Sequence, residues 1–128
     1  MKIYLSIKYY SDNQNRELIE NIYNFIQPAH RVSCIIRDGE KWGEIKFSPQ
    51  ELMKKTFVEI DACDALLVEF SEKGVGIGIE IGYAHAHKKP IIVIAREGSD
   101  ISNTVKGVAQ KIIFYTSYED MKSKLALL

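Results

Sequence analysis

The sequence predicts an α/β protein in which helices cover a single parallel β-sheet. Short apolar runs alternate with amphipathic segments along the whole chain, five of each, and this alternation is typical of repeated strand–helix units. The third apolar run contains no polar side chain before Glu69, which is expected of a strand buried on both faces. Both observations favour a parallel sheet.

The composition and charge fit one globular domain of 128 residues, of which 46% are hydrophobic and 27% charged. Seventeen basic residues balance seventeen acidic ones, so no overall field would draw the protein to a nucleic acid polymer or to a membrane surface. No apolar run reaches the length of a membrane span and no signal peptide is evident, so the expected location is the cytoplasm. Cys34 and Cys63 are expected to be reduced, buried thiols, and no residue cluster has the spacing of a metal site.

The predicted strands and helices follow one another in order. The strands are expected at residues 2–7, 32–36, 65–70, 91–95 and 111–115. Helices are expected after residues 11–14, after Ser48, at residues 77–87, within residues 97–109 and at residues 117–128. The simplest arrangement of five such units is a flavodoxin-like three-layer sandwich with about five helices and the strand order 2-1-3-4-5.

Capping residues mark several helix starts. Capping boxes are expected at residues 11–14 and at residues 117–120. Ser48 precedes a proline, which favours a helix that begins at Pro49. Residues 37–47 carry two glycines and no helical stripe, so they are expected to form a loop with turn chemistry.

The ends of the first and third strands are the predicted ligand site, because a crevice opens there in a sheet of this order. The third strand is followed by a run with glycines at positions 74, 76, 78 and 82. Glycine lets backbone N–H groups approach a ligand closely, and the start of the following helix favours anions. The spacing does not fit a dinucleotide fingerprint, since isoleucine replaces the last glycine, so a generic tight turn is the alternative.

Glu80 lies within this glycine-rich run and is expected in the first turn of the helix. There a carboxylate either stabilises the helix dipole or faces the crevice as a reactive group. After the first strand, Lys8, Tyr9 and Tyr10 offer one cation and two aromatic rings, which could hold a phosphate and stack a base. Such residues are also common at ordinary protein surfaces, and both interpretations stay open.

Three segments, residues 64–69, 74–84 and 89–94, carry a resemblance to a known family. With them the chain resembles, over nearly its whole length, the nucleoside 2-deoxyribosyltransferase family, and most of all its 2'-deoxynucleoside 5'-monophosphate N-hydrolase branch. Members of that branch are small homodimers on a flavodoxin-like fold that need no metal. The resemblance implies a single domain over residues 1–128, a nucleoside or nucleotide substrate and no cofactor.

The resemblance also implies roles for individual residues. In the family, the glutamate of a Glu-Φ-Gly step is the nucleophile at the anomeric carbon of the sugar, and this role falls on Glu80. Tyr4 matches a tyrosine at the sugar site, and Gly76 and Gly78 match positions that supply backbone contacts. Ser102 matches a serine that reaches the ligand of the neighbouring subunit in the hydrolases.

Three positions depart from the family pattern. Thr56 stands where an acid assists protonation of the leaving base, and a threonine cannot serve as that acid; Glu59, one turn later, is a weak substitute. Gly74 stands where the family has a phosphate-binding serine. The family's Gly-Ser-Ile-Arg loop after the first strand is absent, and Lys8 or Lys73 would supply the missing anion contacts.

The leading hypothesis is an enzyme that cleaves the N-glycosidic bond of a nucleoside or nucleoside 5'-monophosphate, by hydrolysis or deoxyribosyl transfer, with Glu80 as the nucleophile. Its expected pocket is formed by Tyr4, Lys8, Tyr10, Gly76 and Gly78. The threonine at position 56 supports an alternative, a non-catalytic nucleotide-binding or sensing domain on the same fold. An unrelated flavodoxin-like binding module is the third candidate. A homodimer is expected from the family and from the apolar content of the helices before the third strand and after the glycine-rich turn.

Overall fold

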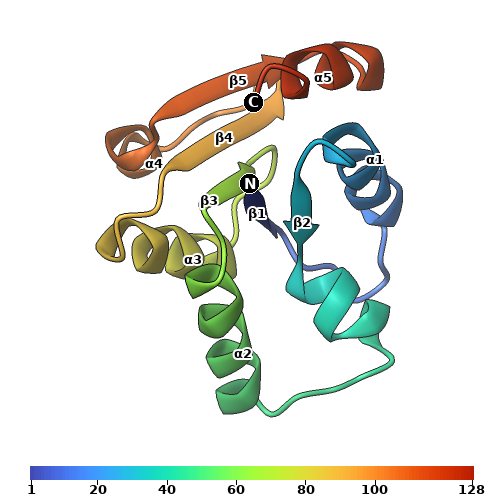
Figure 1. Cartoon of the computed structure of the whole chain (residues 1–128), viewed down its shortest axis with the longest axis vertical. Helices are drawn as coiled ribbons and strands as arrows, with labels where there is room; N and C mark the ends of the chain where they lie inside the picture. Colours follow the sequence, from blue (N-terminus) through green and yellow to red (C-terminus); the bar gives the residue numbers. More distant parts are fainter.

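The computed structural model describes residues 1–128 and contains one β-sheet of five strands (Figure 1). The strands are β1 (Lys2–Ile7), β2 (Arg31–Ser33), β3 (Ala65–Glu69), β4 (Ile91–Arg96) and β5 (Lys111–Tyr115). Their order in the sheet is β2-β1-β3-β4-β5, and each neighbouring pair is parallel. The predicted fold class and strand order are therefore confirmed.

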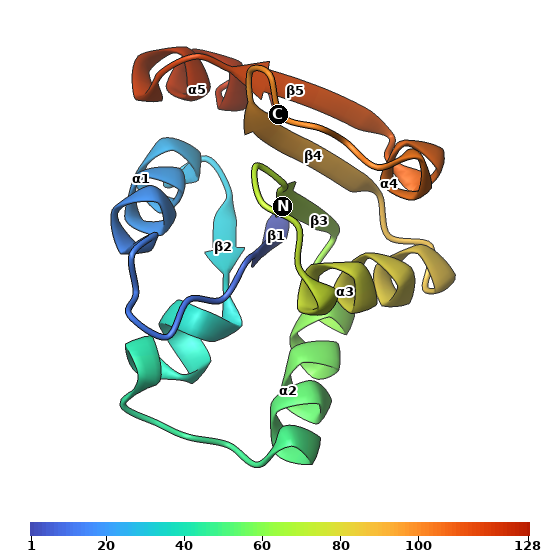
Figure 2. The ribbon, with the colours of Figure 1, turned by 180° about the vertical axis from the view of Figure 1, so that it is seen from behind.

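Five α-helices and two short helical segments connect or follow the strands. The α-helices are α1 (Arg16–Ile26), α2 (Pro49–Asp61), α3 (Val75–Ala86), α4 (Asn103–Val108) and α5 (Tyr118–Leu125). The segment after β2 forms a π-helix at Ile35–Gly39 and a 3-10 helix at Lys41–Gly43. This segment and α2 lie at the same end of the molecule (Figure 1 and Figure 2). None of the helices has both the length and the apolar character that crossing a membrane requires.

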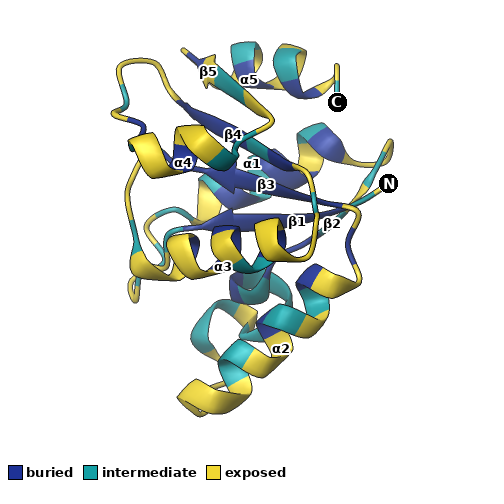
Figure 3. Cartoon of the chain, turned by 90° about the vertical axis from the view of Figure 1, so that its left-hand side faces the viewer, coloured by how far each residue is buried: buried dark blue, intermediate teal, exposed yellow.

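Apolar side chains fill a core on each face of the sheet. Helices α1 and α5 cover one face, where Ile22 and Leu125 belong to the core, and α2, α3 and α4 cover the other, where Ile81 does. Figure 3 shows the central strands buried and the outer surfaces of the helices exposed. Cys34 and Cys63 are both free and buried, as predicted.

Strand β1 sends successive side chains to opposite faces of the sheet. Leu5 and Ile7 belong to the core under α1, whereas Tyr4 lies in the core under α3. Strands β1 and β3 pair in register as far as Ile7 opposite Glu69, so both strands end at the same level. The side chains of Tyr4 and Ser6 therefore approach the start of α3, the helix that follows β3.

The second strand is shorter than predicted because the Asp38 side chain forms a hydrogen bond with the backbone directly after it. Strand β2 ends at Ser33, whereas it was expected to reach residue 36. The backbone N–H of Cys34 donates to the carboxylate of Asp38 at 3.1 Å, and Ile35–Gly39 then form the π-helix. The predicted loop at residues 37–47 is thus partly helical.

Two of the predicted helix caps are present. The Ser48 hydroxyl accepts the N–H of Glu51 at 3.2 Å, and the Glu51 carboxylate accepts the N–H of Ser48 at 3.2 Å, which closes a capping box at the start of α2. At the start of α5, the Ser117 hydroxyl accepts the N–H of Asp120 at 3.1 Å, but the Asp120 carboxylate accepts the N–H of Thr116 at 2.9 Å and not that of Ser117, so the predicted capping box is only half formed. Both helices therefore begin where side chains satisfy their first N–H groups.

The capping box predicted at residues 11–14 is wrong. Helix α1 begins at Arg16, and no side chain caps it. The carboxylate of Asp12 instead accepts the N–H of Gln14 at 3.2 Å. An aspartate that bonds the backbone two residues later forms a local turn, which competes with helix initiation.

Candidate active site

Glu80 is buried between α3 and β1. Helix α3 begins at Val75, so Glu80 is its sixth residue and lies outside the first turn. The predicted first-turn position is therefore wrong, and because the helix-dipole effect falls off within the first turn, a helix-stabilising role loses its basis. The side chain is only 7% exposed, and its carboxylate contacts side chains of β1.

Two hydroxyl groups of β1 hold the Glu80 carboxylate. The Tyr4 hydroxyl donates to Oε2 at 2.6 Å, and the Ser6 hydroxyl donates to Oε1 at 2.7 Å. Each carboxylate oxygen thus has one fixed donor and keeps a lone pair for a ligand. Ser6 is absent from the predicted site residues. Its spacing of two from Tyr4 within a strand, which places both on one face, is the signal that could have indicated it.

Burial raises the pKa of Glu80 to about 7, while the hydrogen bonds from Tyr4 and Ser6 act in the opposite direction. Desolvation disfavours the charged form of a carboxyl group, and donors to the ionised form favour it. Near neutral pH this carboxyl group therefore exchanges between its protonated and ionised forms. Burial and the neighbouring carboxylate also raise the pKa of Tyr4, so its hydroxyl stays protonated as a donor.

Glu80 lines a cavity of about 410 Å³ near the ends of β1 and β3. Cavities that bind small molecules are typically about 300–1,000 Å³. Four segments form the wall: the end of β1, the segment after β2, helix α2 and the start of α3. The lining residues are Ile7, Lys8, Tyr9, Ile35, Ile36, Glu40, Leu52, Met53, Thr56, Gly74, Val75, Gly76, Ile77 and Glu80.

The chemistry of the cavity is mixed. All four segments contribute apolar side chains to its wall, and its ionisable lining residues are Lys8, Tyr9, Glu40 and Glu80. Gly74 is the residue before α3, and no side chain caps this helix. The first N–H groups of α3 are therefore available to hydrogen-bond a ligand. The cavity combines an apolar slot, one cation, open backbone donors and carboxyl groups.

Several predicted site residues come together around Glu80. Lys8, Gly74 and Gly76 line the same cavity. Tyr4 is fully buried and reaches this site through its hydrogen bond to the Glu80 carboxylate. The structure thus brings the residues after β1 and those after β3 to one place.

Three predicted site residues do not line the cavity of Glu80. Tyr10 lines a neighbouring cavity of about 570 Å³, together with residues of α1 and β5. Gly78 is exposed on α3, because residues two apart on a helix do not face the same side. Ser102 precedes α4, after the end of β4, and does not line the cavity of Glu80.

The candidate substitutes for the missing family residues are engaged in other contacts. The Glu59 carboxylate accepts the Ser33 hydroxyl at 2.7 Å, and it does not line the cavity. Lys73 forms an ion pair with Asp100 at 2.9 Å. Thr56 does line the cavity, but its hydroxyl donates at 2.8 Å to the backbone carbonyl one turn earlier in α2.

Comparisons with solved structures identify the class of fold, although no protein-family model matches the sequence. The CMP N-glycosidase of Clostridium botulinum superposes with a TM-score of 0.76 at 22% identity, covering 99% of this chain and 98% of that one. A 2-deoxyribosyltransferase of Bacillus psychrosaccharolyticus superposes with a TM-score of 0.70 at 13% identity, covering 98% and 96%. The chain therefore has the α/β fold of nucleoside deoxyribosyltransferase-like proteins.

A curated relative agrees with this assignment. A protein of Thermofilum pendens named 2'-deoxynucleoside 5'-phosphate N-hydrolase 1 is 24% identical over 128 aligned positions, covering 94% of this chain and 87% of that protein. The predicted resemblance to the nucleoside 2-deoxyribosyltransferase family is thereby confirmed. The similar proteins named here are enzymes of N-glycosidic bonds.

Proposed function

We propose that this protein is an enzyme that cleaves the N-glycosidic bond of a nucleoside or nucleoside 5'-monophosphate, by hydrolysis or deoxyribosyl transfer, with Glu80 as its nucleophile. One observation carries the proposal: a buried glutamate, held by the hydroxyls of Tyr4 and Ser6, lines a cavity of about 410 Å³, a size typical of small-molecule sites. The names of the similar proteins, an N-hydrolase, an N-glycosidase and a deoxyribosyltransferase, support the same chemistry.

The reaction follows from the position of the Glu80 carboxylate. Cleavage of an N-glycosidic bond develops positive charge on the anomeric carbon, and a nearby carboxylate stabilises that charge. A bond forms between a Glu80 oxygen and this carbon while the carbon–nitrogen bond breaks, and its electron pair leaves with the base, which takes up a proton. Water or a second base then attacks the glycosyl ester and releases Glu80.

Tyr4 and Ser6 prepare the nucleophile. Their hydroxyls fix both carboxylate oxygens, so the carboxylate does not rotate away from its bonding direction. Their donation also favours the ionised form, against the burial that raises the pKa of Glu80 to about 7. A carboxylate of raised pKa is a stronger nucleophile than a solvated one, and it is still ionised in a large fraction of molecules at neutral pH.

Two further features of the cavity fit a nucleotide. Lys8 lines it beside Gly74, and the side chain of Lys8 would lie 3.7 Å from a Cβ at that position. A lysine next to the open N–H groups of a helix start is suited to a 5'-phosphate. The apolar side chains of Ile36 and Met53 offer a surface for the base. These contacts support a nucleoside monophosphate over a free sugar.

A second candidate function is a non-catalytic nucleotide sensor. The observation in its favour is Thr56, because its hydroxyl is occupied by a backbone carbonyl and offers no acid to the leaving base. A sensor would bind the same ligands in the same cavity and release no base. Ligand binding without turnover therefore separates the two functions.

The test is incubation of the protein with ribo- and deoxynucleosides and their 5'-monophosphates, with free base measured by chromatography. The enzyme is expected to release base from at least one of them, and Glu80→Gln to release none. Glu119→Gln, at an exposed position on α5, is the matched control and is expected to keep full activity. No release by the wild-type protein, together with thermal stabilisation by a nucleotide, would instead favour the sensor.

We also propose that the chain forms a homodimer. Aliphatic side chains are exposed on two helices that pack together, α2 and α3: Val58 is 59% exposed, Val75 83% and Ile79 47%. Exposed apolar side chains on helices that pack together support a protein contact. Light scattering at micromolar concentration should give twice the 14.6 kDa mass of the chain, and Val75→Glu should lower it. A monomer mass for the wild-type protein would contradict the proposal.

A further inference from the structure

A second carboxyl group, that of Glu40, lines the cavity of Glu80. Glu40 follows the π-helix after β2, and in the folded chain it lies in the wall that also includes Thr56 of α2. Burial raises the pKa of the Glu40 carboxyl group. No hydrogen bond or ion pair engages this carboxyl group, in contrast to the carboxylates of Glu59 and Glu80.

The backbone around Glu40 is fixed by local hydrogen bonds. Its N–H donates to the carbonyl of Ile35 at 2.8 Å, and its own carbonyl accepts the N–H groups of Gly43 at 3.0 Å and Ile45 at 2.9 Å. The next residue but one, Trp42, has a left-handed φ of 60°. A tryptophan in this conformation is strained, so the surrounding contacts must hold the turn.

Those contacts come from the segment before α1 and from its first residue. The side-chain amide of Asn13 donates to the carbonyl of Trp42 at 3.0 Å. The guanidinium of Arg16 lies over the Trp42 ring, 4.6 Å from its centroid, which is a cation–π geometry. The turn that follows Glu40 is therefore tied to α1.

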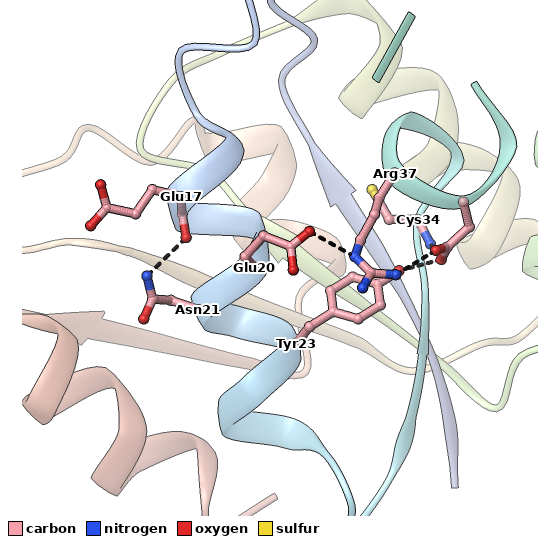
Figure 4. Close-up of polar contacts among 7 residues, drawn as sticks. Glu17, Glu20, Asn21, Tyr23, Cys34 and Arg37 are labelled. Carbon is pink, nitrogen blue, oxygen red and sulfur yellow. Dashed lines mark hydrogen bonds and ion pairs between the residues drawn. The ribbon is translucent and has the colours of Figure 1, made fainter. Parts of the chain in front are cut away.

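The π-helix that precedes Glu40 is also tied to α1. Arg37 donates from Nε to Glu20 at 3.0 Å and from Nη1 to Asp38 at 2.7 Å, and the Tyr23 hydroxyl donates to the same aspartate. Figure 4 shows Arg37 beside Glu20 and the Tyr23 ring. The Asp38 carboxylate also accepts the N–H of Cys34. Glu40 thus projects from a segment that is anchored on both sides.

We propose that Glu40 is the proton donor to the leaving base. This inference rests on the proposed function, and it supplies the acid that Thr56 cannot. As the carbon–nitrogen bond breaks, the Glu40 carboxyl proton passes to the base, which leaves as a neutral molecule, and Glu40 becomes a carboxylate. Water then attacks the sugar–Glu80 ester, its proton passes to Glu40, and both carboxyl groups return to their starting states.

The charged surroundings of Glu40 are compatible with this role. Lys8 and Glu80 line the same cavity, and Lys41, Lys54 and Lys55 line an adjoining cavity of about 770 Å³ together with Glu51 and Asp38. None of these groups forms a hydrogen bond or an ion pair with the Glu40 carboxyl group. A partly buried carboxyl group without an ion pair keeps its proton more readily than one at the surface, as a proton donor must.

The experiment compares two substrates in Glu40→Gln. One is the best nucleotide substrate of the wild-type protein, and the other is its analogue with a nitro-substituted base, which departs as a stabilised anion and needs little protonation. For the ordinary substrate, kcat is expected to fall by about 10²–10⁴-fold, the usual contribution of a general acid. For the nitro analogue, kcat/KM, which reports only the step that breaks the carbon–nitrogen bond, should stay within a few-fold of wild type, whereas kcat falls because the water step still lacks its base. Glu44→Gln, exposed in the same segment, is the matched control.

Each other outcome overturns the proposal in a recognisable way. An equal loss of kcat/KM on both substrates would mean that Glu40 only supports the structure, and a higher KM with unchanged kcat would mean that it only binds the base. Unchanged kinetics would exclude any role. If the wild-type protein releases no base from any substrate, the proposed function fails together with this inference; a wild-type activity that depends on Glu80 but not on Glu40 overturns the inference alone.

Discussion

Two buried glutamates near the carboxyl end of β3, Glu69 and Glu80, differ in their hydrogen-bond partners. Glu69, the last residue of β3, is 3% exposed and accepts the backbone N–H of Ser71 at 2.6 Å and the Tyr115 hydroxyl at 3.2 Å. Glu80 is 7% exposed, and both of its donors are side-chain hydroxyls of one strand. Glu69 therefore fixes the turn after β3, whereas Glu80 is oriented without being tied to a backbone group.

Burial alone therefore does not distinguish the two carboxylates, whereas their hydrogen-bond partners do. A carboxylate that satisfies a backbone N–H is part of the fold, and removing it leaves that donor unpaired. Both glutamates line a cavity, but a carboxylate held only by hydroxyl groups can change its bonding without disturbing the backbone. The first three of the following predictions test this distinction between Glu69 and Glu80, and the fourth tests the raised pKa of Glu80.

The largest effect is expected for Glu80→Gln. Base release should fall by at least about 10³-fold, because the amide cannot act as the nucleophile. Glu69→Gln is the matched variant at an equally buried position and should keep its activity within about tenfold of wild type. Initial rates of base release, measured for both variants together with thermal unfolding, separate a loss of activity from a loss of folding. Similar losses in the two variants would remove the functional distinction.

The second effect concerns stability. Glu69→Ala should lower the free energy of unfolding by about 2–3 kcal/mol, because the Ser71 N–H and the Tyr115 hydroxyl lose their acceptor. Denaturant unfolding monitored by circular dichroism measures this loss. The folded fraction should retain base release. A stable but inactive Glu69→Ala protein would place Glu69 in the reaction and contradict the comparison.

A smaller effect is expected for Tyr4→Phe. This change removes one donor to the ionised form of Glu80, so the pKa of Glu80 should rise further. The activity of the wild-type protein should increase with pH through about 7, the pKa of Glu80. In Tyr4→Phe this rise should move to higher pH, with about tenfold lower activity at pH 7. Tyr115→Phe, which affects the donor to Glu69, should leave the profile in place.

The smallest effect is the pH dependence of stability. The pKa of Glu80 is about 7 in the folded protein against an ordinary value of 4.5, so between these values the folded state binds a proton that the unfolded state has lost. The contribution of Glu80 to the free energy of unfolding should therefore decrease as pH rises from 4.5 to 7, by at most about 1.4 kcal/mol per pH unit. Glu80→Gln should lack this component, and identical curves for both proteins would exclude the raised pKa.

Much of the fold follows from local sequence patterns. The alternation of apolar runs and amphipathic segments predicted the parallel sheet and its order, and Ser48 before a proline predicted the start of α2. The end of β2 could not be predicted in this way. It depends on the contact of Asp38 with the Cys34 N–H and with Tyr23, and Tyr23 lies on α1, fifteen residues earlier in the sequence.

The site was predictable where residues share one strand end or one loop. Lys8, Gly74 and Gly76 meet Glu80 because β1 and β3 end at the same level. The part of the cavity wall formed by the segment after β2 was not predictable, since Glu40 is placed there by the π-helix that precedes it and the left-handed turn that follows it. No periodic pattern in the sequence encodes that turn.

The proposed covalent bond between Glu80 and the sugar is tested most directly by trapping the glycosyl ester. The protein is incubated with its substrate, or with an analogue fluorinated at the 2' position to slow release, and is quenched in acid and digested. Mass spectrometry should find the sugar ester on the peptide that contains Glu80, and no ester in Glu80→Gln. An ester on another residue, or base release at the wild-type rate by Glu80→Gln, would contradict the account.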